Sequence, residues 1–98
     1  MENNNIATNR WNNFGILVRN IYISLGKPMH PDVDFYLKEP VENTLHMLRI
    51  CKTAGLTIDD IAKLVIDKLH VNPDDIKEAD IRRLRRFGDY FCLICMVS

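Results

Sequence analysis

Glycine and cysteine are both scarce in this sequence, and neither sign of charge prevails. Four glycines among 98 residues leave no glycine-rich loop of the kind that cradles phosphate groups. Three cysteines are too few, and odd in number, for the disulfide framework of a small secreted protein. They fit a reducing compartment, so we expect a cytoplasmic protein. Thirteen basic and thirteen acidic residues cancel, so the molecule as a whole does not attract nucleic acid or an anionic membrane.

Long hydrophobic runs are also missing. The longest, YFCLICMV at residues 90–97, has eight residues, whereas a transmembrane helix needs about 20 apolar residues. The first ten residues contain no basic segment followed by an apolar one, so we expect no secretory signal. A content of 47% hydrophobic and 27% charged residues is ordinary for a globular protein. We therefore expect a single helical domain over residues 1–98, with a disordered N-terminus at residues 1–7.

Hydrophobic spacing predicts an all-α fold, a small bundle of about four helices. Apolar residues recur at steps of three and four within segments 8–25, 41–54, 58–69 and 73–95. The connection at 27–40 contains three prolines and has no helical period, and we expect a short extended piece at 33–37. In the last segment the period continues beyond Gly88, which favours one long helix over a helix followed by a strand at 89–97.

Two short stretches, LTIDDI at 56–61 and VNPDDI at 71–76, share an apolar residue, a capping residue and paired aspartates. The first predicts Thr57 as a helix N-cap, with Asp60 completing a capping box. The second predicts Asn72 as the cap of the last helix. Acidic side chains in a first helical turn are stabilised by the helix dipole. These features explain the aspartates as helix starts, so we interpret neither stretch as a metal or catalytic site.

The run RRLRR at 82–86 is the strongest local concentration of charge. On a helix, Leu84 faces the core and the four arginines cover the outer surface. Acidic residues three or four positions away predict ion pairs that neutralise much of this charge: Glu78 with Arg82, Asp80 with Arg83, and Asp89 with Arg85. No aromatic or amide side chain is interleaved to stack on bases or read them, so a solvated, ion-paired face is favoured over a phosphate-binding patch. The predicted partner-binding residues are Arg82, Arg83, Arg85, Arg86, Phe91 and Ile94.

An alternative interpretation is a helix-turn-helix nucleic-acid binder over residues 47–64, where small and apolar residues flank a turn at Gly55. The second helix of such a motif would begin with Asp59 and Asp60, which DNA phosphates repel. Nucleic acid is therefore a partner that we consider but do not favour.

Residues 39–69, EPVENTLHMLRICKTAGLTIDDIAKLVIDKL, resemble the second half of the all-α nucleoside-triphosphate pyrophosphatases of the MazG type. In that family a helix opens with Glu-x-x-Asp, runs to a Gly-apolar corner and is followed by an acidic helix start. The resemblance implies that Glu39 and Glu42 are catalytic carboxylates that bind Mg²⁺ for nucleotide hydrolysis. No Glu-x-x-Glu motif occurs at residues 9–25, so the resemblance implies a degenerate or partner-completed relative of these enzymes.

Cysteine and histidine offer no clear metal site. Cys92 and Cys95 form a single C-x-x-C pair, whereas zinc needs four ligands. The three histidines, His30, His46 and His70, are scattered along the chain, so we predict no bound metal. The last four residues, CMVS, end an apolar segment that we expect to be buried, and a prenylation box is the alternative interpretation.

Large apolar residues exceed what four short helices readily bury, and the aromatic ones among them include Trp11, Phe14, Phe87 and Phe91. We therefore predict a homodimer formed through the first helix or the C-terminal segment. No nucleophile elbow or catalytic triad is visible, so we expect neither an enzyme nor a cofactor. The preferred function is a small intracellular interaction or regulatory protein that binds another macromolecule, most simply another protein.

Overall fold

The computed structural model describes residues 2–97, with the surroundings of the side chains described for residues 6–91 and 93. The regular elements within this range are α1 (Glu2–Leu25), α2 (Pro31–Lys38), α3 (Val41–Thr53), α4 (Ile58–Asp67), the short 3₁₀ helix η1 (Pro73–Asp75) and α5 (Glu78–Val97). The predicted all-α fold is confirmed. The first helix is longer than expected, because it begins at Glu2 rather than at residue 8, and Ala7 is already buried.

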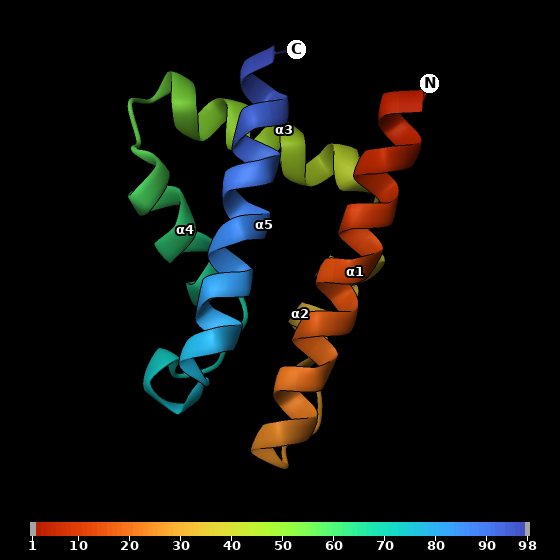
Figure 1. The fold of residues 1–98 in the computed structure, drawn as a ribbon, viewed down its shortest axis with the longest axis vertical. Coiled ribbons are helices and arrows are strands. Elements are labelled where there is room, and N and C mark those ends of the chain that lie inside the picture. The colour runs from red at the N-terminus through yellow and green to blue at the C-terminus, as the bar shows by residue number, and fades with distance from the viewer. Residues whose placement is uncertain (1, 98) are drawn as a thin grey trace.

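α5 is the central helix of the bundle, and α1, α3 and α4 all pack against it. α1 and α5 run along the long axis of the molecule in opposite directions, so the two ends of the chain lie at the same end of the bundle (Figure 1). α3 crosses the bundle near that end, and α2 packs against α1 (Figure 1). This arrangement leaves the outer side of α1 at the edge of the molecule (Figure 1).

One cluster of buried side chains fills the space between the helices. Its most deeply buried members, each less than 2% exposed, are Val18, Val33, Ile61, Leu69 and Leu84. They come from α1, α2, α4, the turn after α4, and α5, and α3 adds Val41, Leu45 and Leu48, so all five α-helices contribute to the same core. No buried polar side-chain atom lacks a hydrogen-bond partner among the described residues, as expected of a well-formed interior.

An aromatic group lies where α1, α2 and α5 meet. Trp11 stacks on Phe14, with the ring centroids 5.3 Å apart. Tyr36 and Phe91 contact the indole ring edge-on, at 5.2 and 5.8 Å. The Trp11 Nε1–H group donates a hydrogen bond to the Glu39 carbonyl oxygen at 2.9 Å, which satisfies the one polar atom of the ring. The chain thus covers these large aromatic side chains itself, and they supply no apolar surface for a dimer.

The segment predicted as extended at 33–37 is helical, so that prediction is wrong. His30 caps α2, because its Nδ1 atom accepts a hydrogen bond from the backbone N–H of residue 32 at 3.1 Å. Pro31 occupies the first turn, where its missing N–H is not needed. Val33 and Leu37 lie one helical turn apart and both are buried. Proline in this connection therefore marks the start of a short helix.

The helix predicted at 73–95 is divided, which corrects both its start and the role of Asn72. The Asn72 side chain accepts a hydrogen bond from the backbone N–H of residue 74 at 3.0 Å, but this bond caps η1 and not α5. Ile76 then adopts an extended backbone (φ −90°, ψ 136°), and its side chain is buried. Turning Ile76 into the core explains the break, and α5 begins only at Glu78.

α5 continues without interruption past Gly88 to Val97, as predicted. The alternative of a strand at 89–97 is therefore wrong. Gly88 is buried within the helix, although a side-chain carbon added there would meet no atom within 4 Å. None of the described helices, α5 included, is long and apolar enough to cross a membrane.

The start of α4 is the predicted capping box. The Thr57 hydroxyl accepts a hydrogen bond from the Asp60 backbone N–H at 3.2 Å, and the Asp60 carboxylate accepts one from the Thr57 N–H at 3.1 Å. Hydrogen bonds from the Thr57 backbone and side chain hold the pKa of the Asp60 carboxyl below its ordinary value of 3.8. α3 and α4 both begin where they were predicted and end within two residues of the predicted positions.

Candidate functional site

The four arginines of the predicted partner surface all lie on the exposed side of α5, and Leu84 between them is buried. One of the three predicted ion pairs is formed among the described residues, with Arg83 Nη1 2.8 Å from Asp80 Oδ1. The other three arginines of this surface, Arg82, Arg85 and Arg86, have no carboxylate within 4.0 Å among the described side chains. Their guanidinium groups are therefore available to an acidic partner.

The apolar residues of the same prediction are placed differently. Phe91 is 3% exposed and belongs to the core, so a partner reaches it only if the bundle opens. The side chain of Ile94 lies outside the described residues, as do those of Cys92 and Cys95 and the rest of the CMVS sequence. Leu93, by contrast, is 58% exposed. The exposed residues of this segment therefore include the four arginines and Leu93, with the acidic Asp89 beside them.

The two carboxylates implied by the pyrophosphatase resemblance lie at the junction of α2 and α3. Glu39 follows α2, and its side chain accepts a hydrogen bond from the Asn43 amide. Glu42 lies in the first turn of α3 and is exposed. Neither belongs to a cluster of three or more metal-ligating side chains within the described part of the chain. Mg²⁺ held for phosphate chemistry needs several converging oxygen ligands, so this junction supplies at most part of such a site.

The α3–turn–α4 segment resembles a helix-turn-helix in its geometry, but the first turn of its second helix is acidic. Gly55 makes the turn with a left-handed backbone (φ 91°), and the Leu56 N–H group donates to the Cys51 carbonyl at 3.1 Å. The first turn of α4 exposes Asp59 and Asp60. A recognition helix contacts DNA with its N-terminal residues, so these carboxylates would meet the phosphates and oppose binding.

The fold brings together three side chains that the sequence scatters. The ligand atoms of His30, Asp32 and His70 lie within 4.8 Å of one another. The imidazole rings of His30 and His70 are stacked, with 4.0 Å between their centroids and 3° between their planes. His70 Nε2 lies 3.9 Å from Asp32 Oδ2. Sequence reasoning missed this cluster because the two histidines lie on different loops, and nothing in their spacing pairs them.

This cluster is better suited to joining two loops than to holding a metal ion. A histidine ligand directs its lone pair within the ring plane, and two parallel planes 4.0 Å apart do not meet at one ion. His30 Nδ1 is also occupied by the cap of α2. Next to His70, the Tyr22 hydroxyl donates a hydrogen bond to the Leu69 carbonyl oxygen at 2.5 Å, which ties α1 to this turn. Burial raises the pKa of Tyr22, so the hydroxyl keeps its proton and remains a donor.

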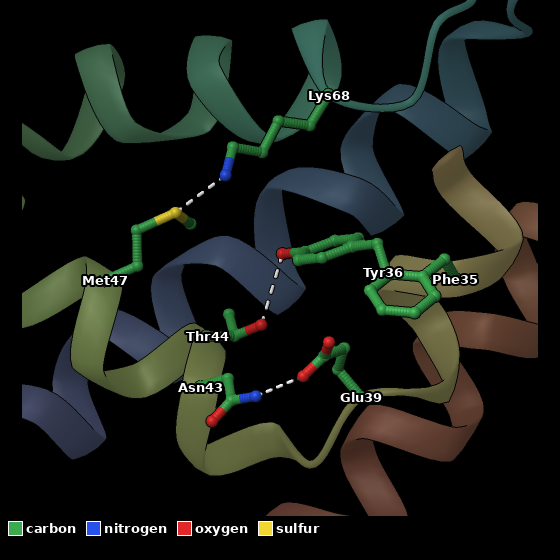
Figure 2. Close-up of a pocket in the computed structure, with 7 residues that line it drawn as sticks. All are labelled: Phe35, Tyr36, Glu39, Asn43, Thr44, Met47 and Lys68. Atoms are coloured by element: carbon green, nitrogen blue, oxygen red, sulfur yellow. Dashed lines mark hydrogen bonds between the residues drawn. The ribbon is translucent and has the colours of Figure 1, made fainter. Parts of the chain in front are cut away.

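A cavity of about 320 Å³ lies between α2, α3 and the C-terminal end of α4 (Figure 2). Its lining residues are Phe35, Tyr36, Glu39, Asn43, Thr44, Met47 and Lys68. The buried Thr44 hydroxyl donates a hydrogen bond to the Tyr36 hydroxyl at 3.2 Å. Across the cavity, Lys68 Nζ lies 2.7 Å from Met47 Sδ and 5.6 Å from the centre of the Tyr36 ring. Burial raises the pKa of Tyr36, so the wall that faces Lys68 stays uncharged.

The outer side of α1 carries a row of uncharged residues that repeats at helical spacing, separate from the row that faces the core. We define the α1 outer stripe as six exposed residues, namely Ile6, Asn9, Asn13, Ile16, Asn20 and Ile23. Their separations of three, four, three, four and three positions are those of a coiled-coil seam. The three isoleucines are 50%, 54% and 74% exposed. Sequence reasoning followed only the core-facing period of this helix and missed the stripe, although its spacing is visible in the sequence.

Comparison with known proteins assigns no family to this chain. No family model, curated protein or solved structure matches the chain. The resemblance of residues 39–69 to pyrophosphatases is therefore carried by those residues alone. The fold defines a small all-α protein with three candidate binding surfaces: the α1 outer stripe, the arginines of α5, and the cavity of Figure 2.

Proposed function

We propose that this protein is a small intracellular regulatory protein that forms a homodimer through the α1 outer stripe and binds an acidic segment of another protein with the arginines of α5. The observation that supports the proposal is the uncharged stripe with coiled-coil spacing on the exposed side of a 24-residue helix. Exposed isoleucines repeated at this spacing are typical of a helix that packs against a second helix.

A second copy of the chain is the partner that the stripe fits best. Each asparagine amide carries both donors and an acceptor, so it can hydrogen-bond to the same amide of an identical chain. Asparagine within a coiled-coil seam lowers stability but selects the register and the number of chains. The nearest charges on the helix, Arg10 and Arg19, flank the stripe on its two sides. Every layer of such a dimer is therefore either apolar or self-complementary.

The stripe is short, so the dimer should be weak. Each isoleucine is half to three-quarters exposed in the single chain, and burying what remains contributes about 1–2 kcal/mol. Three isoleucines from each chain together contribute about 6–12 kcal/mol, whereas association costs about 4 kcal/mol or more. The difference corresponds to a dissociation constant in the micromolar range or above. Reversible association of this strength suits a regulatory protein.

The arginines of α5 supply the second half of the proposal. Arg82, Arg85 and Arg86 have no ion-pair partner among the described side chains, and all three are exposed. Arginine binds carboxylate groups with two parallel hydrogen bonds, so an acidic protein segment is a suitable partner. A two-fold dimer presents this surface twice, which strengthens binding to a partner with two acidic segments.

Sedimentation equilibrium over about 5–500 µM protein tests for a dimer with a dissociation constant in the micromolar part of the expected range. We expect the wild type to dimerise across this range, and the double variant Ile16→Glu/Ile23→Glu to remain monomeric because it places like charges in two layers of the seam. Ile50→Glu is the matched control, because Ile50 is 57% exposed on α3, away from the stripe. Circular dichroism checks that both variants keep their helices. A wild type that stays monomeric at the highest concentration, or equal disruption by Ile50→Glu, contradicts the proposal.

A further inference from the structure

The cavity between α2, α3 and α4 contains a lysine without an anionic neighbour. Lys68 caps the C-terminus of α4 and is half-buried. Its ammonium group has three N–H donors, and its neighbours are the Met47 thioether at 2.7 Å and the face of the Tyr36 ring. No carboxylate of the described residues lies within 4.0 Å of Nζ. A thioether accepts hydrogen bonds only weakly, so this ammonium retains the capacity for a stronger acceptor.

One side of the cavity is aromatic. Phe35 and Tyr36 both come from α2 and lie along the same side in Figure 2. Phe35 is 69% exposed, more than any other aromatic residue among the described side chains. The Tyr36 hydroxyl is already engaged by Thr44, so its ring offers an apolar face without an unsatisfied polar atom. An exposed aromatic ring beside a hollow favours a ligand with an apolar body.

The opposite end of the cavity carries a negative charge. Glu39 lies across the cavity from Lys68, and its carboxylate accepts a hydrogen bond from the Asn43 amide (Figure 2). An acidic ligand is repelled there and attracted at Lys68, so it enters in one orientation. The volume of about 320 Å³ is near the lower limit of ligand pockets. The ligand is therefore small, with a body of about one ring.

We propose that this cavity binds an apolar carboxylate, either a free small acid or the C-terminal residue of a peptide. Lys68 holds the carboxylate, and Phe35 and Tyr36 cover the apolar body. Ligand and protein exchange no atoms, so the cavity acts as a binding site and not as a catalytic one. This inference does not depend on the α1 dimer, because the stripe and the cavity share no residue.

Titration of ¹⁵N-labelled protein with 3-phenylpropionate, followed by NMR, tests the proposal. The neutral amide of the same acid is the matched ligand, and we expect it to bind about tenfold more weakly because it lacks the charge that Lys68 recognises. Lys68→Met keeps the apolar stem and removes the ammonium, so it should weaken the acid about tenfold and leave the amide unchanged. Lys63→Met is the matched control, since Lys63 is exposed on the same helix, and it should bind the acid as the wild type does.

A second variant separates the apolar contact from the charge. Phe35→Ala changes an exposed side chain, so the fold should persist while the acid and the amide both bind several-fold more weakly. A short peptide ending in phenylalanine, with a free or an amidated terminus, distinguishes the two sources of the carboxylate. Tighter binding of the free-terminus peptide than of 3-phenylpropionate assigns the site to chain ends, and the reverse order assigns it to small acids. No binding, equal affinity for acid and amide, or full binding by Lys68→Met overturns the proposal.

Discussion

Replacing Tyr22 with phenylalanine removes the hydroxyl that ties α1 to the turn after α4. This hydroxyl donates to the Leu69 carbonyl oxygen at 2.5 Å, and both residues are buried. A buried carbonyl left without its donor costs about 1–3 kcal/mol, so we expect Tyr22→Phe to lower the free energy of unfolding by about 2 kcal/mol. For a domain of this size, about 1 kcal/mol lowers the melting temperature by 4–8 °C, which gives a decrease of about 10 °C.

Urea unfolding monitored by circular dichroism measures this change, with Tyr90→Phe as the matched control. Tyr90 is half-buried, and no hydrogen bond of its hydroxyl is found among the described residues. Its ring, which the Arg10 guanidinium covers at 4.6 Å, is kept in the variant. We expect Tyr90→Phe to change the free energy of unfolding by less than about 0.5 kcal/mol. A loss for Tyr22→Phe no larger than that of the control would refute the role given to the Tyr22 hydroxyl.

The same substitution alters the dependence of stability on alkaline pH. Burial raises the pKa of Tyr22 above its ordinary value of 10.0, so the folded state keeps a proton that the unfolded chain releases. The stability linked to this proton is complete below about pH 10 and is lost as the pH rises through the raised pKa. Burial raises the pKa of Tyr36 in the same way. The wild type should therefore lose stability above pH 10 more steeply than Tyr22→Phe, and identical slopes would contradict this account.

Two further substitutions test local features. Thr57→Ala removes the side-chain half of the capping box and should cost about 1 kcal/mol in urea unfolding, with the exposed Thr53→Ala as control. The NMR-titrated pKa of Asp60 should rise toward 3.8, so the loss of stability as the pH falls below that value should become shallower; an unchanged pKa would speak against the assigned hydrogen bonds. Replacing Arg82, Arg85 and Arg86 together with glutamine should reduce retention on immobilised polyglutamate several-fold, whereas Arg83→Gln, whose arginine is already paired with Asp80, should have a smaller effect. Retention on duplex DNA that falls steeply with salt would instead favour the nucleic-acid alternative.

The helices were predictable from the sequence where local interactions determine them. Thr57 and Asp60 satisfy each other within one turn, so the start of α4 needs no information from the rest of the chain. The extended piece expected at 33–37 failed because the burial of Val33 and Leu37 on one helical face depends on neighbouring helices. The break before α5 was not predicted, for the same reason. Ile76 leaves the helix to enter a core whose other members are distant in the sequence.

The candidate sites were less accessible, because each is assembled by the fold. The cavity takes residues from three helices, and neither the ammonium of Lys68 nor the thioether of Met47 forms part of a motif. The stacked pair of His30 and His70 depends on two loops that Tyr22 helps to join. The α1 outer stripe differs from these sites, because all its residues lie on one helix and their spacing can be read from the sequence. The three asparagines between its isoleucines interrupt the apolar period, so apolar spacing alone does not reveal it.

The central position of α5 has a consequence for how this domain is made in the cell. α5 is the helix against which α1, α3 and α4 pack, and it is also the last of them in chain order. When α1 leaves the ribosome, Trp11 and Phe14 have no covering helix; α2 then brings Tyr36 to Trp11, but the contacts with Phe91 and Phe87 wait for α5. We therefore expect part of the future interior to stay exposed on the nascent chain until α5 has been synthesised, and the core to close only then.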